Sequence, residues 1–427
     1  MRVSSAYGRG ISHILKKSKK PRAIIMRHNK NNSLIHSYTL TKTASYIGYV
    51  VQAITINFTP LLFVCFMGQY SLSMREISAL VTLTFVFQFS IDFLSVFLLR
   101  RVGYRALVLA AHALSCAGLV LLCVLPEIMD SFLGLCIAVG VYSSGSGFIE
   151  VVVSPIIESC PSRNKAAQMS FLHSFYCWGQ VAAVGISTLY FAFFGVEAWK
   201  TMTFIWACIP LLNILLFSLC PLDVDVTIGT SKPLRALFGR RDFLLLMLII
   251  MCSGAAEIAL SQWASAYCET ALGVSKTVGD IAGPMGFAVC MGISRLGYAV
   301  LGDRLKLEWC MLASSVLCAI GYLVVSLSPS AVLSLVGFGV CGLSVGVLWP
   351  GAFSLASKRV DGGGSMYALL SFSGDAGCTI GPLVCGLCAS AFGDDIGRGI
   401  LCCVGFSVLL CVAMLSFIAV SAKNTEK

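Results

Sequence analysis

The chain has 427 residues, of which 57% are hydrophobic and only 12% are charged, and its mean hydropathy is +0.87. A soluble globular domain carries about 25% charged residues, so this composition excludes a soluble enzyme and predicts a membrane protein. The net charge of +10 is concentrated near the N-terminus, because residues 1–38 hold nine of the 30 Lys and Arg residues.

The N-terminal extension, residues 1–43, is predicted to be disordered and cytoplasmic. Its basic residues include Lys16, Lys17, Lys19 and Lys20. A basic segment tethered beside a bilayer is attracted to anionic headgroups, so the membrane itself explains the charge and no nucleic-acid partner is needed. The apolar run that follows has full spanning length, which indicates a membrane helix and not a cleaved signal peptide.

Apolar runs of spanning length recur along the rest of the chain. A segment of about 20 apolar residues crosses the hydrocarbon core of a bilayer. The longest connection, residues 221–242, is predicted to be a central cytoplasmic loop between two six-helix bundles, 44–220 and 243–420, with a cytoplasmic tail at 421–427. The sequence therefore predicts an all-α membrane protein with 12 spans, at 44–67, 77–99, 106–125, 132–157, 166–194, 201–220, 243–267, 279–301, 309–327, 331–355, 366–391 and 399–420.

The charge of the loops predicts the orientation. With both termini placed in the cytoplasm, the inner loops carry 13 Lys and Arg residues, against four in the outer loops: Arg75, Lys200, Lys276 and Arg398. Positive charge favours the cytoplasmic side. We expect a multi-pass protein of the plasma membrane with both termini in the cytoplasm.

The 20 cysteines predict neither a metal site nor a redox centre. Nearly all lie inside apolar runs, where cysteine behaves as a small hydrophobic residue. The pair Cys385 and Cys388 has C-x-x-C spacing but lies on a predicted membrane helix. No ATP-binding loop or nucleotide fingerprint is visible. We therefore predict no cofactor and no metal, and an ion gradient as the energy source.

Glu150 lies in the fourth predicted span, between Gly145 and Pro155. A charged acid at the centre of a membrane helix costs about 2.5–3.5 kcal/mol, so such residues usually face a cavity or a partner and mark a transport pathway. Burial favours the neutral acid, which allows such a group to load and release a proton. The alternative is an acid near a helix end that is paired for structural reasons.

His173 follows in the fifth span, at a depth similar to that of Glu150 if each residue rises about 1.5 Å along its helix. A Glu–His contact between neighbouring helices is one possibility, and a His bonded to a backbone carbonyl on another face is the other. Tyr176, Trp178 and Gln180 come next, and aromatic and amide side chains can line a sugar-sized cavity. The alternative for each is packing against lipid.

The second half carries further polar residues within its spans. Glu257 in the seventh span is followed by Gln262 and Trp263, and Asn57 occupies the corresponding place in the first span. Polar residues at symmetric places near mid-membrane are where rocking-bundle transporters hold substrate. We therefore expect Asn57, Gln262 and Trp263 to line a substrate site.

Arg295 lies well inside the eighth span and requires a carboxylate or carbonyl partner. Asp375, Asp303 and Asp92 are the candidates. Asp375 lies in the eleventh span among glycines that allow close helix approach. We group Glu150, His173, Glu257 and Asp375 as candidate proton-coupling or substrate-binding residues.

The two halves resemble each other in sequence. Met169, Leu172, Ser174 and Phe175 recur at an offset of 197 as Met366, Leu369, Ser371 and Phe372. Two parallel six-helix halves joined by a central loop are typical of major-facilitator transporters.

The turn from Arg295 to Arg304 resembles the G-x-x-x-D-R gating signature of the major facilitator superfamily. The resemblance implies that Asp303 caps a helix or pairs with an arginine across the two halves, with Arg304 beside it. In the first-half copy Arg100 stands in the place of the aspartate, followed by Arg101 and Arg105. These loop residues are predicted to act in gating or structure, or to set the topology alone.

Within that superfamily, the fourth and fifth spans resemble the fucose and glucose/galactose permease branch. Gly145, Gly147, Glu150 and Pro155 match the branch's fourth helix, although Ser154 replaces its asparagine. The resemblance implies a role for Glu150 in proton coupling and sugar binding. The aspartate of the branch's first helix has no match here.

The stretch from Gly346 to Leu355 resembles the tenth helix of the same branch. It contains Trp349, which we expect to line the substrate site.

The sequence thus predicts a monomeric secondary transporter that couples a small polar solute, most readily a sugar, to a proton gradient by alternating access. Sodium is the alternative coupling ion. An exporter of amphipathic compounds is the alternative function, and the fifth span argues against it because it lacks the proline typical of such exporters. A polytopic membrane enzyme would need acidic or histidine clusters in large loops, and the loops here are short. We predict that the protein is not an enzyme.

Overall fold

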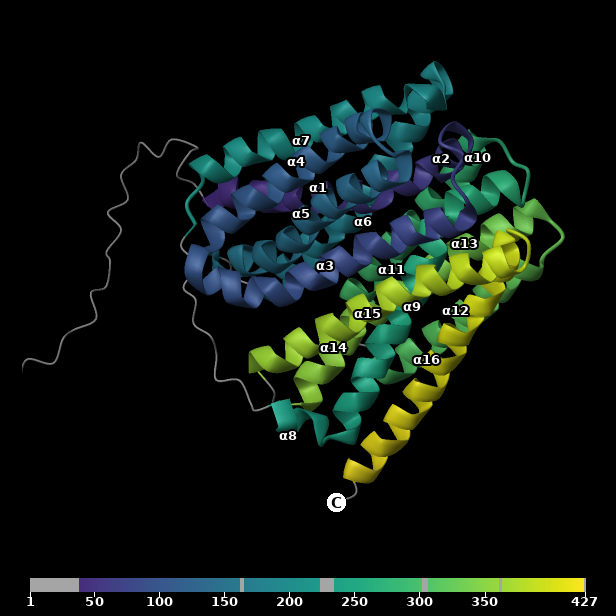
Figure 1. Ribbon diagram of the computed structural model, residues 1–427. Helices are drawn as coiled ribbons and strands as arrows, with labels where there is room; N and C mark the ends of the chain where they lie inside the picture. The colour runs from purple at the N-terminus through teal and green to yellow at the C-terminus, as the bar shows by residue number, and fades with distance from the viewer. Residues whose placement is uncertain (1–37, 162–164, 223–233, 302–305, 361–362, 426–427) are drawn as a thin grey trace, which may run out of the picture.

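The computed structural model describes residues 38–161, 165–222, 234–301, 306–360 and 363–425. Within these ranges the chain forms helices joined by short loops, and no strand is present (Figure 1). The N-terminal half comprises α1 (Tyr38–Asn57), η2 (Thr59–Leu62), α2 (Phe63–Gln69), α3 (Met74–Val102), α4 (Tyr104–Ile128), α5 (Ser131–Ser159), α6 (Lys165–Phe194), η3 (Val196–Ala198) and α7 (Trp199–Leu219).

The C-terminal half begins with the short helix α8. It comprises α8 (Leu234–Phe238), α9 (Arg241–Thr270), α10 (Lys276–Asp280), η4 (Ile281–Met285), α11 (Gly286–Leu301), α12 (Leu307–Leu327), α13 (Ala331–Val345), α14 (Leu348–Arg359), α15 (Gly363–Ala391) and α16 (Ile396–Thr425). Twelve helical segments of the described chain are long and apolar enough to cross a membrane, which confirms the predicted number of spans.

Several helices extend beyond the predicted spans. α1 begins at Tyr38, inside the predicted N-terminal extension, and α16 continues to Thr425 through most of the predicted tail. Tertiary bonds stabilise the polar start of α1, because Thr41 Oγ1 donates to Pro221 O (2.8 Å) and Lys42 Nζ donates to Pro161 O (2.8 Å). The basic residues before Tyr38 and part of the predicted central loop, residues 223–233, lie outside the described residues.

Three of the spans are interrupted. The first breaks between α1 and α2 at Pro60, the eighth contains the π-helical turn η4 around Pro284, and the tenth divides at Gly346, between α13 and α14. Proline lacks the N–H that continues a helix, and such breaks leave backbone groups available for other partners.

Glycines allow helices to pack at close range within each half. In the N-terminal half a Cβ added at Gly118 of α4 would collide with the backbone of Tyr142 on α5. In the C-terminal half a Cβ at Gly377 of α15 would collide with the carbonyl of Met251 on α9. Small residues permit such backbone approach in membrane helices, where no hydrophobic effect drives association.

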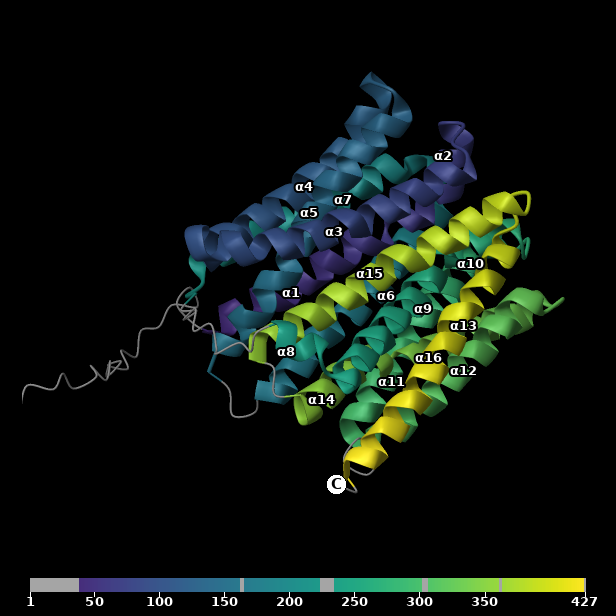
Figure 2. The same cartoon turned by 60° about the horizontal axis from the view of Figure 1, so that its bottom comes forward.

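The two halves meet along α3 and α15, which lie side by side in Figures 1 and 2, and along α6 and α11. We call the end of the bundle that carries residues 70–73 and 271–275 the outer end, following the predicted orientation. From there the helices of the two halves diverge toward the opposite, inner end, as α7 and α16 show in Figure 1.

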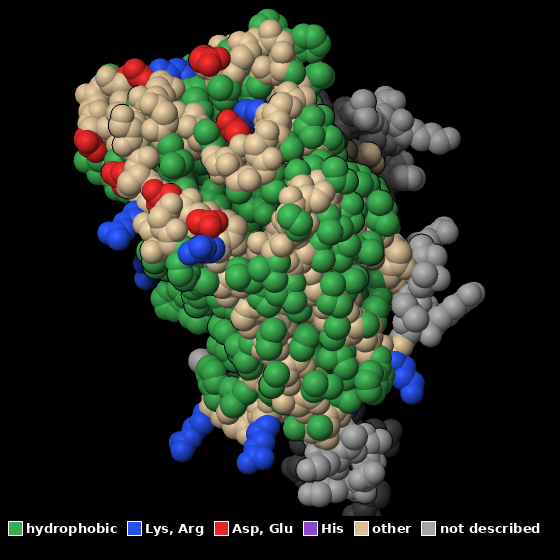
Figure 3. All heavy atoms as spheres, turned by 90° about the vertical axis from the view of Figure 1, so that its right-hand side faces the viewer, with side chains coloured by type: hydrophobic (Ala, Val, Ile, Leu, Met, Phe, Trp, Pro, Cys, Tyr) green, Lys and Arg blue, Asp and Glu red, His purple; other side chains and the backbone are tan. Residues whose placement is uncertain are grey.

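Charged side chains gather at the two ends of the surface shown in Figure 3. Asp and Glu lie toward the upper left together with several Lys and Arg, further Lys and Arg mark the lower margin, and hydrophobic side chains cover most of the area between them. This distribution suits a protein whose middle lies in hydrocarbon and whose ends lie in water.

Candidate functional site

Glu150 lies at the meeting point of α1, α3 and α5. Its Oε2 atom accepts a hydrogen bond from Gln52 Nε2 on α1 (2.7 Å) and a second one from Gln88 Nε2 on α3. Both amides are about as buried as core residues, at 4% and 5% exposed, while Glu150 is half-buried. Hydrogen bonds to a charged acceptor are about twice as strong as neutral ones, so the two amides fix the carboxylate in place.

Small residues on α5 make this approach possible. A Cβ added at Gly147 would lie 3.0 Å from the backbone oxygen of Gln88, so the backbones of α3 and α5 are in close contact here. This contact lies at the level where the side-chain amide of Gln88 bonds to Glu150. The predicted run of glycines before Glu150 therefore has a packing role. Sequence reasoning did not identify Gln52 or Gln88, although both amides lie inside predicted spans.

Asp375 brings a second acid toward this site from the C-terminal half. It lies on α15 and is 5% exposed. α15 packs along α3, and Phe372, one turn before Asp375, lies with its ring 4.4 Å from that of Phe89. This contact places Asp375 near the level of Gln88 along the α3–α15 interface, and Asp375 and Glu150 interact electrostatically.

Glu257 and Arg295 form an ion pair in the C-terminal half. Arg295 on α11 is 3.7 Å from Glu257 on α9, which is 7% exposed. Among the described residues, α9 therefore supplies a carboxylate partner for Arg295, Glu257, which was not predicted from the sequence as its partner. The side chains of Asp92 and Asp303 lie outside the described residues.

The guanidinium group of Arg295 also faces the N-terminal half. It interacts electrostatically with Tyr176 and Cys177 of α6 and with His173 one turn earlier. The ion pair thus lies at the interface of the halves, where a bound solute could contact both.

His173 packs against Tyr49. The two rings make an edge contact with centroids 5.1 Å apart, and Tyr49 Oη lies 3.0 Å from Ser154 Oγ, one turn beyond Glu150. Tyr49 therefore connects His173 to the fourth span, whereas the carboxylate of Glu150 is occupied by the two amides. A direct contact between Glu150 and His173, one of the two arrangements considered from the sequence, is not among the hydrogen bonds of the described residues.

The other predicted polar residues join elements across the site. Asn57 Nδ2 donates to Ala53 O (2.9 Å) and to Tyr176 Oη (3.4 Å). Gln180 Nε2 donates to Ser261 Oγ on α9 (3.1 Å), which connects the two halves.

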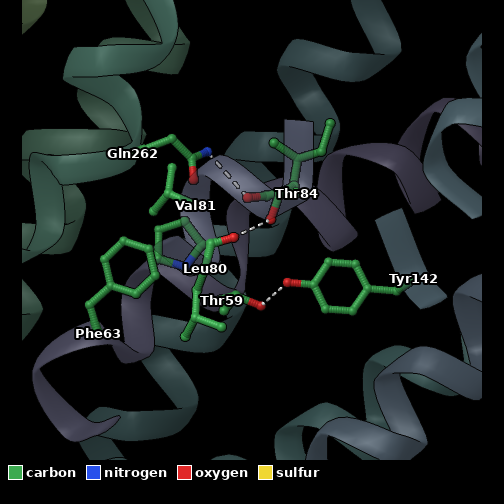
Figure 4. A pocket seen from close by; sticks show the side chains of 9 residues that line it. Thr59, Phe63, Leu80, Val81, Thr84, Tyr142 and Gln262 are labelled. Carbon is green, nitrogen blue, oxygen red and sulfur yellow. Dashed lines mark hydrogen bonds between the residues drawn. The ribbon is translucent and has the colours of Figure 1, made fainter. Parts of the chain in front are cut away.

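Gln262 Nε2 donates to Ile56 O at the end of α1 (3.3 Å), a second link between the halves. It borders a cavity of about 10 Å³ that is also lined by Thr59, Thr84 and Tyr142 (Figure 4). A space of this size holds about one water molecule. This cavity is too small for a sugar.

The three tryptophans that were predicted to line the site differ in position. Trp263 is fully buried, and its Nε1 donates to Pro382 O (3.1 Å), so it belongs to the packed core of α9 and α15. Trp349 packs over Gly374 of α15, and Trp178, which is 40% exposed, lies beside Gly292 of α11. Trp349 and Trp178 therefore remain candidates for contact with a solute, and Trp263 has a structural place.

The predicted gating residues also differ. Arg105 donates to the carbonyls of Phe217 (3.0 Å), Ser218 (3.1 Å) and Cys220 (2.9 Å), which caps the end of α7. Arg101 is exposed, and Asp303 and Arg304 lie outside the described residues. Among the residues that the structure describes, no three His, Cys, Asp or Glu side chains are grouped as metal ligands.

Comparison with known proteins gives one family. The family model described as Major Facilitator Superfamily matches residues 45–382. An uncharacterized MFS-type transporter of Yersinia pestis is 26% identical over 319 residues, which cover 73% of this chain and 78% of the relative.

Solved structures share the fold at low sequence identity. The nucleoside transporter NupG has a TM-score of 0.72 and 12% identity, covering 89% of this chain and 99% of its own. The D-xylose-proton symporter has a TM-score of 0.72 and 14% identity, covering 89% and 96%. The fucose:proton symporter of E. coli has a TM-score of 0.63 and 17% identity, covering 90% and 99%.

Proposed function

The chain belongs to the major facilitator superfamily of transporters, and on this basis we propose that it is a symporter that couples the movement of a sugar-like solute to a proton. The observation that carries the proposal is the half-buried carboxylate of Glu150, which is held by two amides beside the interface of the halves. A titratable group placed there can respond to the arrangement of both halves.

Glu150 is the proposed proton carrier. In the deprotonated state its carboxylate accepts from Gln52 and Gln88. Asp375 places a second negative group across the interface, and two carboxylates that face each other repel unless one is protonated. Binding of one proton thereby allows the two halves to come together around the site.

Arg295 and Glu257 are the proposed solute-binding pair, together with Asn57, Tyr176 and Gln180. Arg295 reaches toward α6 while it is neutralised by Glu257, so it can donate hydrogen bonds to hydroxyl groups without leaving a free buried charge. Trp178 and Trp349 supply the aromatic surface. A sugar needs both kinds of contact, polar groups for its hydroxyls and aromatic faces for its ring.

The proposed cycle is alternating access. The N-terminal half rocks against the C-terminal half about the contacts of α3 with α15 and α6 with α11. We further propose that the protein acts as a monomer in the plasma membrane, with the basic N-terminal extension at the cytoplasmic surface.

Reconstituted protein with Glu150→Gln tests the proposal. We expect the variant to lose accumulation of solute against its gradient and to retain counterflow exchange, because exchange needs alternating access but no net proton movement. Glu127→Gln is the matched control, since Glu127 is an acid at the outer end that bonds to Lys200. Accumulation by Glu150→Gln at the wild-type level would overturn the assignment.

A further inference from the structure

Two charged residues of the eighth span connect the halves at the outer end. Lys276 and Asp280 lie one turn apart on α10 and both reach the N-terminal half. Lys276 Nζ donates to the carbonyl oxygen of Leu61 in η2 (2.6 Å), and Thr188 Oγ1 of α6 donates to Asp280 Oδ2 (3.2 Å). Each half thus contributes one donor and one acceptor.

The same two residues are held in position from within the C-terminal half. Asp280, which is 1% exposed, accepts a hydrogen bond from Ser265 Oγ of α9 (2.5 Å) and lies 3.3 Å from Lys276 Nζ. Lys276 also lies 3.8 Å from Glu269 Oε2. A buried acid is costly unless it is paired and hydrogen-bonded, and here α9 and α10 supply both conditions.

The acceptor on the other side results from the broken first span. Pro60 interrupts the helix there, and η2 presents the Leu61 carbonyl to Lys276. The carbonyl oxygen of Leu61 is neutral, so breaking the bond leaves no unpaired charge in the N-terminal half. On opening, Lys276 keeps Asp280 and Glu269 as neutralising partners, so the separation exposes no unpaired lysine.

We propose that Lys276 and Asp280 form a latch that holds the outer end closed in the inward-facing state and opens once in every transport cycle. The latch consists of Lys276 and Asp280 on α10, Leu61 in η2 and Thr188 on α6. It makes these residues part of the transport machinery although they lie away from the carboxylate of Glu150. The inference does not depend on the identity of the solute or of the coupling ion.

Two variants remove the inter-half bonds in different ways. Thr188→Val keeps the shape of the side chain and the Lys276–Asp280 pair but removes the donor to Asp280. The double variant Lys276→Met with Asp280→Leu removes the donor to Leu61, the acceptor of Thr188 and both charges together, so neither member of the pair is left as an unpaired buried ion. Glu269, whose side chain is 31% exposed, is the neighbouring acid that loses its cation. Lys200→Ala is the control, because Lys200 is an outer-end lysine whose partner, Glu127, lies in the same half.

Hydrogen–deuterium exchange of the full-length protein in nanodiscs, measured by mass spectrometry, reports the protection of the backbone amides at each end of the bundle. It needs no attached probe and no solute. For both variants we expect exchange to rise by roughly two- to tenfold in residues 57–67 and 261–285, the effect of losing one or two hydrogen bonds. We expect exchange to fall at the inner ends of α5 and α14, because opening of the outer end closes the inner end.

Unchanged exchange in both variants would overturn the latch. An increase at both ends would also overturn it, since that pattern reports local loosening and not rocking. Lys200→Ala should match the wild type. The exchange experiment tests the latch alone, and the transport assays of Glu150→Gln test proton coupling alone. Either proposal can therefore be contradicted without the other.

Discussion

Gln52 donates a hydrogen bond of 2.7 Å to Glu150, which joins the first and fourth spans at the only intramembrane carboxylate that accepts from two amide side chains among the described residues. Together with the bond from Gln88, it ties α1 and α3 to α5 at one carboxylate oxygen. It also means that the charge on Glu150 is coupled to the packing of three helices, as a proton-dependent switch requires.

Gln88→Leu tests this coupling. The variant leaves the carboxylate of Glu150 with one donor fewer, and hydrogen bonds to charged groups contribute about 1.5–3 kcal/mol. We expect a lower thermal unfolding temperature at neutral pH, and a smaller loss when the same change is made in the Glu150→Gln protein. Equal losses in the two backgrounds, measured by intrinsic fluorescence, would show that Gln88 and Glu150 are not coupled.

The pair of Arg295 and Glu257 predicts an asymmetric response to substitution. Arg295→Gln leaves Glu257 as a buried charge without its cation, a change that costs about 3–5 kcal/mol. We expect poor folded yield from this variant and recovery of yield when Glu257→Gln is added. Transport should not recover in the double variant, because the arginine that faces α6 is missing.

Two glycines of the C-terminal half give a matched test of packing. Gly377→Ala places a methyl group against the Met251 carbonyl, whereas nothing lies within 4 Å of the position a Cβ would take at Gly405. We expect Gly377→Ala to lower the thermal unfolding temperature. Gly405→Ala should leave it unchanged or raise it, because alanine favours a helix by up to about 1 kcal/mol over glycine. Equal effects would contradict the observed contact of α15 with α9.

His173→Phe separates packing from proton relay. The substitution keeps an aromatic ring against Tyr49 and removes the titratable group. Because the amides of Gln52 and Gln88 occupy the carboxylate of Glu150, we expect the ratio of protons to solute to be retained. A drop in that ratio, measured by simultaneous pH and solute uptake in proteoliposomes, would assign a relay role to His173.

Much of the fold could be predicted from the sequence. The twelve spans follow from apolar length, and Glu150 stood out because a charge inside a span is costly. The helix breaks at Pro60 and Pro284 were not predicted, because apolar length alone does not show whether a proline inside a span interrupts its helix. The start of α1 at Tyr38 depends on a tertiary bond of Thr41, which composition does not reveal.

Pairing within the site was harder to predict. Gln52 and Gln88 carry no charge, so nothing in the sequence singles them out among the other polar residues of the spans. Their bonds to Glu150 depend on the packing of α1 and α3 against α5. Glu257 was recognised as a candidate, but its pairing with Arg295 depends on how α9 and α11 face each other. Lys276 was counted as a loop charge, although it connects the two halves.

The most direct test of the account is the proton signal of the purified protein when sugars are added. A pH indicator in weakly buffered detergent solution would report uptake or release by the wild type and by Glu150→Gln. The account predicts a signal for at least one sugar that disappears in Glu150→Gln and persists in the control Glu127→Gln. A sugar-dependent signal of equal size in Glu150→Gln would contradict the central role of this carboxylate.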